Sequence, residues 1–266
     1  MVGARADAHY DSAIDVSSSP DALEAAAVLA HRPLLRTLEE KAQPTHTALL
    51  VIDVQNDFCA AGGMMDREGQ DLRDVQEMAA ALPRLIDAAR AAGVLVVFVR
   101  NVYSTAENHY LSDVWLEQAS RRRSGSYTVW PVCEAGSWEG DFYSVRPLPE
   151  EPVITKHRFS AFHNTDLETV LRAHSIRSVV LSGVATNVCV ETTAREAFVR
   201  DYYVIFLSDG TATYDRAGHE TTLSSIDRFF GQVATIEDVV TCWSTVARGQ
   251  DSAVSPPELA PSPSAS

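Results

Sequence analysis

Short apolar runs recur along the chain and alternate with amphipathic segments. Between the runs, helical spacing of apolar side chains predicts helices over residues 75–92, 191–200, 217–229 and 236–246. Gly93 follows the first of these and is expected to cap it. The runs have the length and β-branched content of buried strands, and they cover residues 47–52, 94–99, 152–155, 178–181, 203–207 and 232–236.

The order strand, helix, strand predicts an α/β domain with a six-stranded, mostly parallel, doubly wound sheet. We place this domain at residues 44–247. Residues 1–43 are polar and rich in alanine, and we interpret them as an N-terminal extension with a short helix possible at 21–30. Residues 248–266 consist largely of Pro, Ser and Ala without periodicity, so a disordered tail is expected.

One long stretch, residues 101–151, breaks the alternation and is rich in aromatic and polar residues. Irregular segments of this length inside a compact domain are commonly binding loops or lids. We expect this aromatic stretch to cover the mouth of an active site. A contact between subunits is the alternative, and one surface can serve both purposes.

Charge and cysteine content narrow the possible partners. The formal net charge is −14, which argues against nucleic acid and anionic membrane surfaces. No segment has the apolar length of a membrane span, and the first residues do not have the pattern of a secretion signal. The four cysteines lack metal-ligand spacing, so we interpret them as reduced thiols in a cytoplasmic protein without a metal.

Three residues with chemical potential follow predicted strands. Asp53 ends the first strand, Lys156 follows the third, and Cys189 lies between the fourth strand and a helix. The carboxyl ends of strands in a wound sheet form the usual ligand crevice. Each residue alone is commonly structural, as a turn cap, a solvated lysine or a buried thiol. Their joint position at strand ends favours a catalytic group.

These residue types form a consistent nucleophilic mechanism. A helix N-terminus and the charge of Lys156 would favour the thiolate of Cys189, which would attack an electrophilic carbon. Asp53 would act as general base and then as general acid. The backbone N–H groups of Ala185 and Cys189 are candidates for an oxyanion hole, since Gly183 permits a tight turn there.

Three sequence motifs resemble the isochorismatase-like cysteine hydrolase superfamily. They are residues 53–58 (Asp-Val-Gln-Asn-Asp-Phe), Lys156 before a Phe-Ser-Ala-Phe segment, and residues 183–197 around Cys189. The resemblance extends over about residues 47–243. It implies a three-layer αβα fold with a six-stranded parallel sheet, an Asp-Lys-Cys triad, and a cis peptide between Val184 and Ala185. It also implies assembly as a dimer or tetramer.

The chain departs from two branches of that superfamily. Nicotinamidases carry a metal-binding Asp-x-His and a further His after the first strand, and residues 53–100 contain no histidine. Isochorismatases proper lack the nucleophilic cysteine. The similar branches are therefore metal-free and cofactor-free, namely ureidoacrylate amidohydrolase, biuret hydrolase, N-carbamoylsarcosine amidohydrolase and, more broadly, streptothricin hydrolase.

The leading hypothesis is a cysteine-dependent amidohydrolase that cleaves a C–N bond of a small ureido or carbamoyl amide through a thioester. A lactam hydrolase is one alternative, because the negative charge would attract a cationic compound such as streptothricin. A binding protein without catalysis is another. Candidate substrate contacts are Gln55, Asp57, Phe58, Arg158, Phe162 and Asn187. For the two phenylalanines the core is the more common place, because aromatic side chains mostly contribute buried area.

Overall fold

The computed structural model describes residues 33–103, 110–122 and 131–251. Residues from Thr37 onward form one compact unit, which is the subject below. The predicted helix at 21–30 and residues 252–266 of the predicted tail lie outside the described residues. The last helix, α11 (Ile236–Asp251), continues past residue 247 into the segment predicted as tail.

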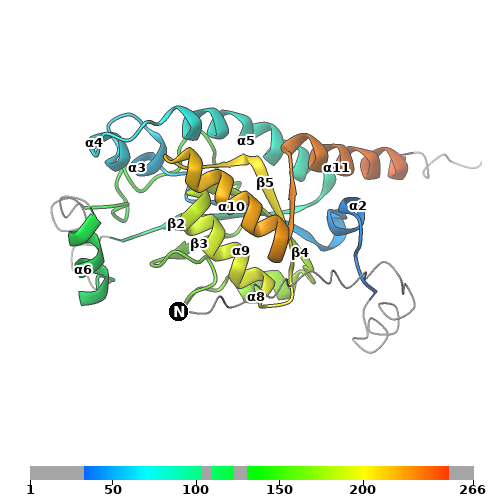
Figure 1. Ribbon diagram of the computed structural model, residues 1–266. Helices are drawn as coiled ribbons and strands as arrows, with labels where there is room; N and C mark the ends of the chain where they lie inside the picture. Colours follow the sequence, from blue (N-terminus) through cyan, green and yellow to red (C-terminus); the bar gives the residue numbers. More distant parts are fainter. Residues whose placement is uncertain (1–32, 104–109, 123–130, 252–266) are drawn as a thin grey trace, which may run out of the picture. The chain divides into compact units, whose positions relative to one another are not determined.

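A single six-stranded sheet forms the centre of this unit (Figure 1). Every strand pair is parallel, and the strand order is β3-β2-β1-β4-β5-β6. The strands are β1 (Thr47–Ile52), β2 (Leu95–Asn101), β3 (Val153–Lys156), β4 (Ser178–Val184), β5 (Tyr203–Ala212) and β6 (Gln232–Ala234). The predicted doubly wound sheet is confirmed, with all of its strands parallel rather than most of them.

Helices cover both faces of the sheet and make the three layers that the resemblance implied (Figure 1). One face, with Leu49 and Val51, packs on α5 (Arg73–Ala92) and α11. The opposite face, with Leu50 and Ile52, packs on the other group of helices. That group consists of α8 (Leu167–Ala173), α9 (Glu191–Phe198) and α10 (Arg216–Phe229). Because β1 is buried on both faces, its sequence is continuously apolar.

The segment before β1 packs on the domain. Thr37 caps the short helix α2 (Leu38–Lys41) through a capping box, and the 3₁₀ turn η2 (Pro44–His46) leads into β1. Trp243 on α11 is buried, and its Nε1 donates a hydrogen bond to the carbonyl of Ala42 at 2.9 Å. Residues 37–43, predicted as part of the extension, therefore contribute to the core of the domain.

The aromatic stretch contains regular structure. A helix, α6 (Asp113–Arg122), occupies its middle, and residues 104–109 and 123–130 lie outside the described residues. Trp115 on α6 contacts the rings of Tyr103 and Phe159, with centroids 5.1 and 4.8 Å apart. Two further short helices, α3 (Asn56–Cys59) and α4 (Met64–Arg67), follow β1. Trp115 thus attaches α6 to aromatic rings at the end of β2 and after β3.

Candidate active site

The structure brings Asp53, Lys156 and Cys189 together at the carboxyl end of the sheet. Lys156 Nζ lies 2.7 Å from Asp53 Oδ2. The thiol of Cys189 lies close enough to both of these side chains for their charges to affect its pKa. Asp53 and Lys156 are fully buried, and Cys189 is 7% exposed. A carboxylate, an ammonium group and a sulfur thus share one buried cluster.

The backbone of Asp53 is fixed immediately after β1. Its φ is +54°, which is the left-handed region that Asp tolerates better than most residues. Its N–H donates to the carbonyl of Val99 at 2.9 Å, and its carbonyl accepts from the N–H of Gln55 at 2.8 Å. This turn stops the strand ladder and holds the carboxylate in place, at a conformational cost typical of functional sites.

Lys156 is the last residue of β3, and its side chain is enclosed by protein. Its Nζ also donates to the carbonyl of Arg158 at 3.1 Å. Burial lowers the pKa of Lys156, but the charges of Asp53 and Cys189 outweigh that effect and the net pKa is raised. Lys156 therefore keeps its proton. Burial raises the pKa of Asp53 in spite of the nearby ammonium group.

Cys189 lies in a π-helical turn, η3 (Thr186–Val190), that connects β4 to α9. Burial raises the pKa of Cys189 to about 12, because the lowering by Lys156 is smaller and Asp53 opposes it. This direction is opposite to the resting thiolate expected from the sequence. The helix N-terminus and Lys156 favour the thiolate, but desolvation of the sulfur raises its pKa by more than Lys156 lowers it, and the charge of Asp53 raises it further.

The turn before Cys189 contains the non-proline cis peptide Val184–Ala185 that the resemblance implied. Val188 and Val190 both donate their N–H groups to the carbonyl of Ala185. The N–H of Ala185, which lies between β4 and η3, takes no part in the described backbone–backbone bonds outside helices and strands. The oxyanion hole formed by the N–H groups of Ala185 and Cys189 stays a prediction.

Two of the predicted substrate contacts are occupied by structural hydrogen bonds. Gln55 is fully buried and bonds through its amide to the backbone of Asn101 and Gly140. Asp57 is also buried and accepts from the N–H groups of Met64 and Cys133 at 2.9 and 2.6 Å. These side chains hold loops together through hydrogen bonds, and their role as substrate contacts stays a prediction.

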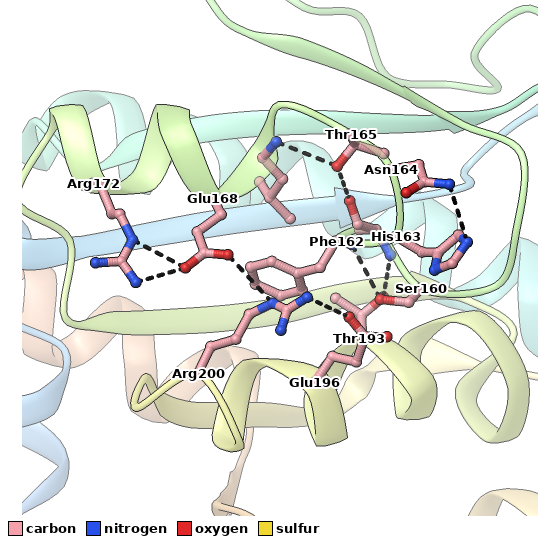
Figure 2. Close-up of polar contacts among 12 residues, drawn as sticks. Ser160, Phe162, His163, Asn164, Thr165, Glu168, Arg172, Thr193, Glu196 and Arg200 are labelled. Atoms are coloured by element: carbon pink, nitrogen blue, oxygen red, sulfur yellow. Dashed lines mark hydrogen bonds and ion pairs between the residues drawn. The ribbon is translucent and has the colours of Figure 1, made fainter.

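Phe58 and Phe162 are core residues in the structure. Phe58 packs in the cluster beneath α5 and Phe162 in the cluster on the opposite face. Figure 2 shows the ring of Phe162 beside Arg200, whose guanidinium carbon lies 5.2 Å from the ring centroid. Their packing therefore agrees with a place in the hydrophobic core, which was the alternative to substrate contact.

Arg158 and Asn187 are half-buried and already have partners. Arg158 donates to the carbonyl of Tyr110 at 2.8 Å and lies over the ring of Trp115. It therefore ties the loop after β3 to the aromatic stretch. Asn187 accepts from the hydroxyl of Thr213 at 2.9 Å. That bond joins η3 to the segment after β5.

Two polar residues at the site escaped sequence reasoning. Asn101 is the last residue of β2, and its position at a strand end matches the signal that identified Asp53 and Lys156. Thr193 lies one helical turn after Cys189, and its hydroxyl donates to the carbonyl of Cys189 at 2.7 Å. Spacing of four residues from a nucleophile on a helix is the signal that would have found it.

Within the described residues, no group of three or more His, Cys, Asp or Glu side chains has the geometry to hold a metal ion. The helices described there also include none with the length and apolar character needed to cross a bilayer.

Comparison with known proteins places these residues in a family context. Residues 47–238 match the Isochorismatase domain, a range that includes all three motifs. Ureidoacrylate amidohydrolase RutB of Methylobacterium radiotolerans is 36% identical over 209 residues, which cover 73% of this chain and 78% of the relative. RutB of Enterobacter sp. (strain 638) is 34% identical over 233 residues, 82% of this chain and 93% of the relative.

Among solved structures, a cysteine hydrolase from Pseudomonas syringae pv. phaseolicola has a similar fold. Its TM-score is 0.67 at 27% identity, and the match covers 81% of this chain and 99% of that one. N-carbamoylsarcosine amidase from Thermoplasma acidophilum, at 23% identity and a TM-score of 0.56, shows the shared fold alone.

Proposed function

Because the chain belongs to the isochorismatase family, we propose that it is a cysteine-dependent amidohydrolase that cleaves a C–N bond of a small ureido or carbamoyl compound. The single observation that carries this proposal is the buried cluster of Asp53, Lys156 and Cys189. The substrate class is supported by the relatives named ureidoacrylate amidohydrolase.

In the first step, the sulfur of Cys189 attacks the carbonyl carbon of the substrate while Asp53 accepts the thiol proton. Proton transfer accompanies attack, because the thiol is the resting form when its pKa is about 12. The C=O bond opens to a tetrahedral oxyanion. The N–H groups of Ala185 and Cys189 would stabilise that oxygen.

In the second step, the tetrahedral intermediate collapses and the C–N bond breaks. Asp53 donates its proton to the departing nitrogen, which leaves as an amine or ammonia, and the acyl group remains on sulfur as a thioester. Water then attacks the thioester with Asp53 as general base. The C–S bond breaks, the acid product leaves, and the thiol of Cys189 is restored.

Lys156 serves this cycle through its charge. Its ammonium group keeps Asp53 ionised before attack, and burial raises the pKa of Asp53 so that the carboxyl holds a proton between steps. A carboxylate with an ordinary pKa would be a poorer proton acceptor for a thiol. The ammonium group of Lys156 lowers the pKa of Asp53 and burial raises it, and together these effects suit Asp53 to act first as a base and then as an acid.

A product assay tests the proposal. The purified protein would be incubated with ureidoacrylate, biuret, N-carbamoyl amino acids and a cationic lactam, with release of ammonia and ring opening followed separately. Ammonia from ureido compounds, lost in Cys189→Ala, is the expected result. Ring opening without ammonia would favour the lactam alternative. Full activity of Cys189→Ala would refute the cysteine mechanism, and binding without turnover would favour a non-catalytic protein.

We also propose a homo-oligomer, either dimer or tetramer. Exposed apolar side chains at the ends of α9 and α10 support this assembly, since Phe198, Val199 and Phe229 are 46%, 69% and 58% exposed. Light scattering on the wild type and on Phe229→Glu would measure the assembly.

We also propose a cytoplasmic location, because the described cysteines are free thiols. The net charge of −14 argues against nucleic acid or anionic membranes as partners.

A further inference from the structure

Asn101 has an unusual combination of a fixed backbone and an unused side chain. Its N–H donates to Gln55 Oε1 at 2.7 Å, and its carbonyl accepts from Gln55 Nε2 at 2.9 Å. The side chain is fully buried, yet neither its Nδ2 nor its Oδ1 has a hydrogen-bond partner in the described part of the chain. Gln55 therefore holds Asn101 in place while both polar atoms of the amide are left available.

The sheet register places this amide on the catalytic face. Asn101 pairs with Lys156, so the two side chains lie on the same face of neighbouring strands. Val97 and Val99, at two-residue spacing before Asn101, belong to the core cluster that also contains Cys189. Strand alternation thus directs the amide of Asn101 toward the side where Lys156 and Cys189 meet.

An unpaired amide in this position is costly. A buried donor or acceptor without a partner loses its hydrogen bonds to water and gains none in return, and native proteins keep few such groups without a functional reason. Asp53, Lys156 and Cys189 are enclosed in the same way. A substrate that reaches the sulfur from the end of the sheet therefore reaches the neighbourhood of Asn101 as well.

We infer that Asn101 binds the ureido group of the substrate and gives the site its preference for carbamoyl over simple acyl compounds. Oδ1 accepts a hydrogen bond from the terminal NH₂ of the carbamoyl group, and Nδ2 donates to a neighbouring oxygen of the substrate. The inference rests on the proposed function and specifies its substrate class. A methyl group in place of the NH₂ would leave Oδ1 unpaired, which a buried site discriminates against strongly.

Binding to a protein without the nucleophile tests this role. In the Cys189→Ala background, calorimetry would compare N-carbamoylglycine with N-acetylglycine, which differ by NH₂ against CH₃. We expect the carbamoyl compound to bind about ten-fold more tightly or better. Asn101→Leu and the smaller Asn101→Ala should reduce that preference to about two-fold or less. Equal binding of the two compounds, binding of neither, or a preference that survives both substitutions contradicts the inference.

A matched control separates recognition from a structural role. Asn56 is another buried asparagine, but its Nδ2 donates to the carbonyl of Trp138 at 2.7 Å. Asn56→Ala should lower the melting temperature and leave the carbamoyl preference intact. Asn101→Leu should leave the melting temperature unchanged or raised, because it removes an unpaired amide. A lowered melting temperature with an unchanged preference would assign Asn101 a structural role.

The outcomes also separate this inference from the proposed function. Carbamoyl preference that depends on Asn101, in a wild type that hydrolyses no carbamoyl compound, would refute the proposed function and support the inference. Hydrolysis of carbamoyl compounds by the wild type, together with a carbamoyl preference that Asn101→Leu does not alter, would support the proposed function and refute the role of Asn101.

Discussion

The ammonium group of Lys156 lies 2.7 Å from Oδ2 of Asp53, and neither side chain reaches solvent. Within the described residues, no backbone N–H donates to either carboxylate oxygen of Asp53. The charge of Asp53 consequently depends on Lys156 and on the thiol of Cys189. The buried carboxylate and the buried ammonium group stabilise each other, and removal of either one would leave the other as an unpaired buried charge, which destabilises the fold.

Replacement of Lys156 by methionine should therefore harm both stability and activity. Lys156→Met leaves a buried carboxylate without its counter-ion, which costs about 3–5 kcal/mol in the free energy of unfolding. Urea denaturation would measure this loss. The double variant Asp53→Asn, Lys156→Met should recover much of the stability while staying inactive. Equal stability of Lys156→Met and wild type would show that the pair is not coupled as described.

The raised pKa of Cys189 predicts how its labelling depends on pH. With a pKa of about 12, the thiol is protonated at pH 7 and the thiolate fraction grows about ten-fold per pH unit up to that value. Alkylation by iodoacetamide, followed by mass spectrometry of the peptide with Cys189, should accelerate steadily from pH 7 to pH 10. The Cys189→Ala protein supplies the background from the other cysteines. A rate that levels off near neutral pH would instead indicate a thiolate at rest.

The sheet and its three strand-end residues were predictable because their signals are local. Continuous apolar runs mark strands buried on both faces, and a polar residue directly after such a run falls at the ligand crevice. The thiol pKa was not predictable in the same way. It depends on how completely Cys189 is enclosed and on the distance to Asp53, and both are set by residues remote in sequence.

Substrate contacts were the weakest predictions for a related reason. Gln55 is a polar residue beside Asp53, but its amide bonds to the backbone of Asn101 and Gly140. Sequence proximity to a catalytic residue does not reveal whether a side chain is already satisfied. The side-chain amide of Asn101, in contrast, has no hydrogen-bond partner among the described residues, a property that only the three-dimensional hydrogen-bond pattern reveals.

Gly183 allows β4 to approach β1 closely, just before the turn that carries Cys189. Its φ is +113°, and a Cβ at this position would lie 1.9 Å from the carbonyl oxygen of Ile52. Gly183→Ala should destabilise the protein by about 3 kcal/mol or more, through steric overlap and an unfavourable φ. Thermal or urea unfolding would measure the loss.

Gly136 provides the matched control for that substitution. Its φ is +79°, but a Cβ there would meet nothing within 4 Å. Gly136→Ala should cost only about 1 kcal/mol, which is the conformational penalty alone. Similar losses for the two variants would mean that close approach of the strands is not what requires glycine at position 183.

Thr193 connects Cys189, the proposed nucleophile, to the loop that follows Lys156. Its hydroxyl donates to the carbonyl of Cys189 at 2.7 Å and accepts from the N–H of Ala161 at 3.0 Å. Figure 2 shows Thr193 on α9 beside the turn that carries Ser160 and Phe162. One hydroxyl thus links the turn of Cys189 to the segment that begins at Lys156, and we propose it as a positioning residue.

Thr193→Val keeps the shape of the side chain and removes both hydrogen bonds. We expect kcat to fall about ten-fold, because a small displacement of a nucleophile is costly, with little change in KM. Thr193→Ser, which retains the hydroxyl, should restore most of kcat. Steady-state kinetics on the ureido substrate would measure both variants.

The adjacent residue supplies the control. Thr192 donates its hydroxyl to the carbonyl of Val188 at 2.6 Å, a bond of the same spacing that does not reach the loop after Lys156. Thr192→Val therefore removes a similar local bond without separating the two catalytic segments, and its kcat should stay within about two-fold of the wild type. Equal losses in the two valine variants would trace the effect to the helix itself and not to the link between Cys189 and Ala161.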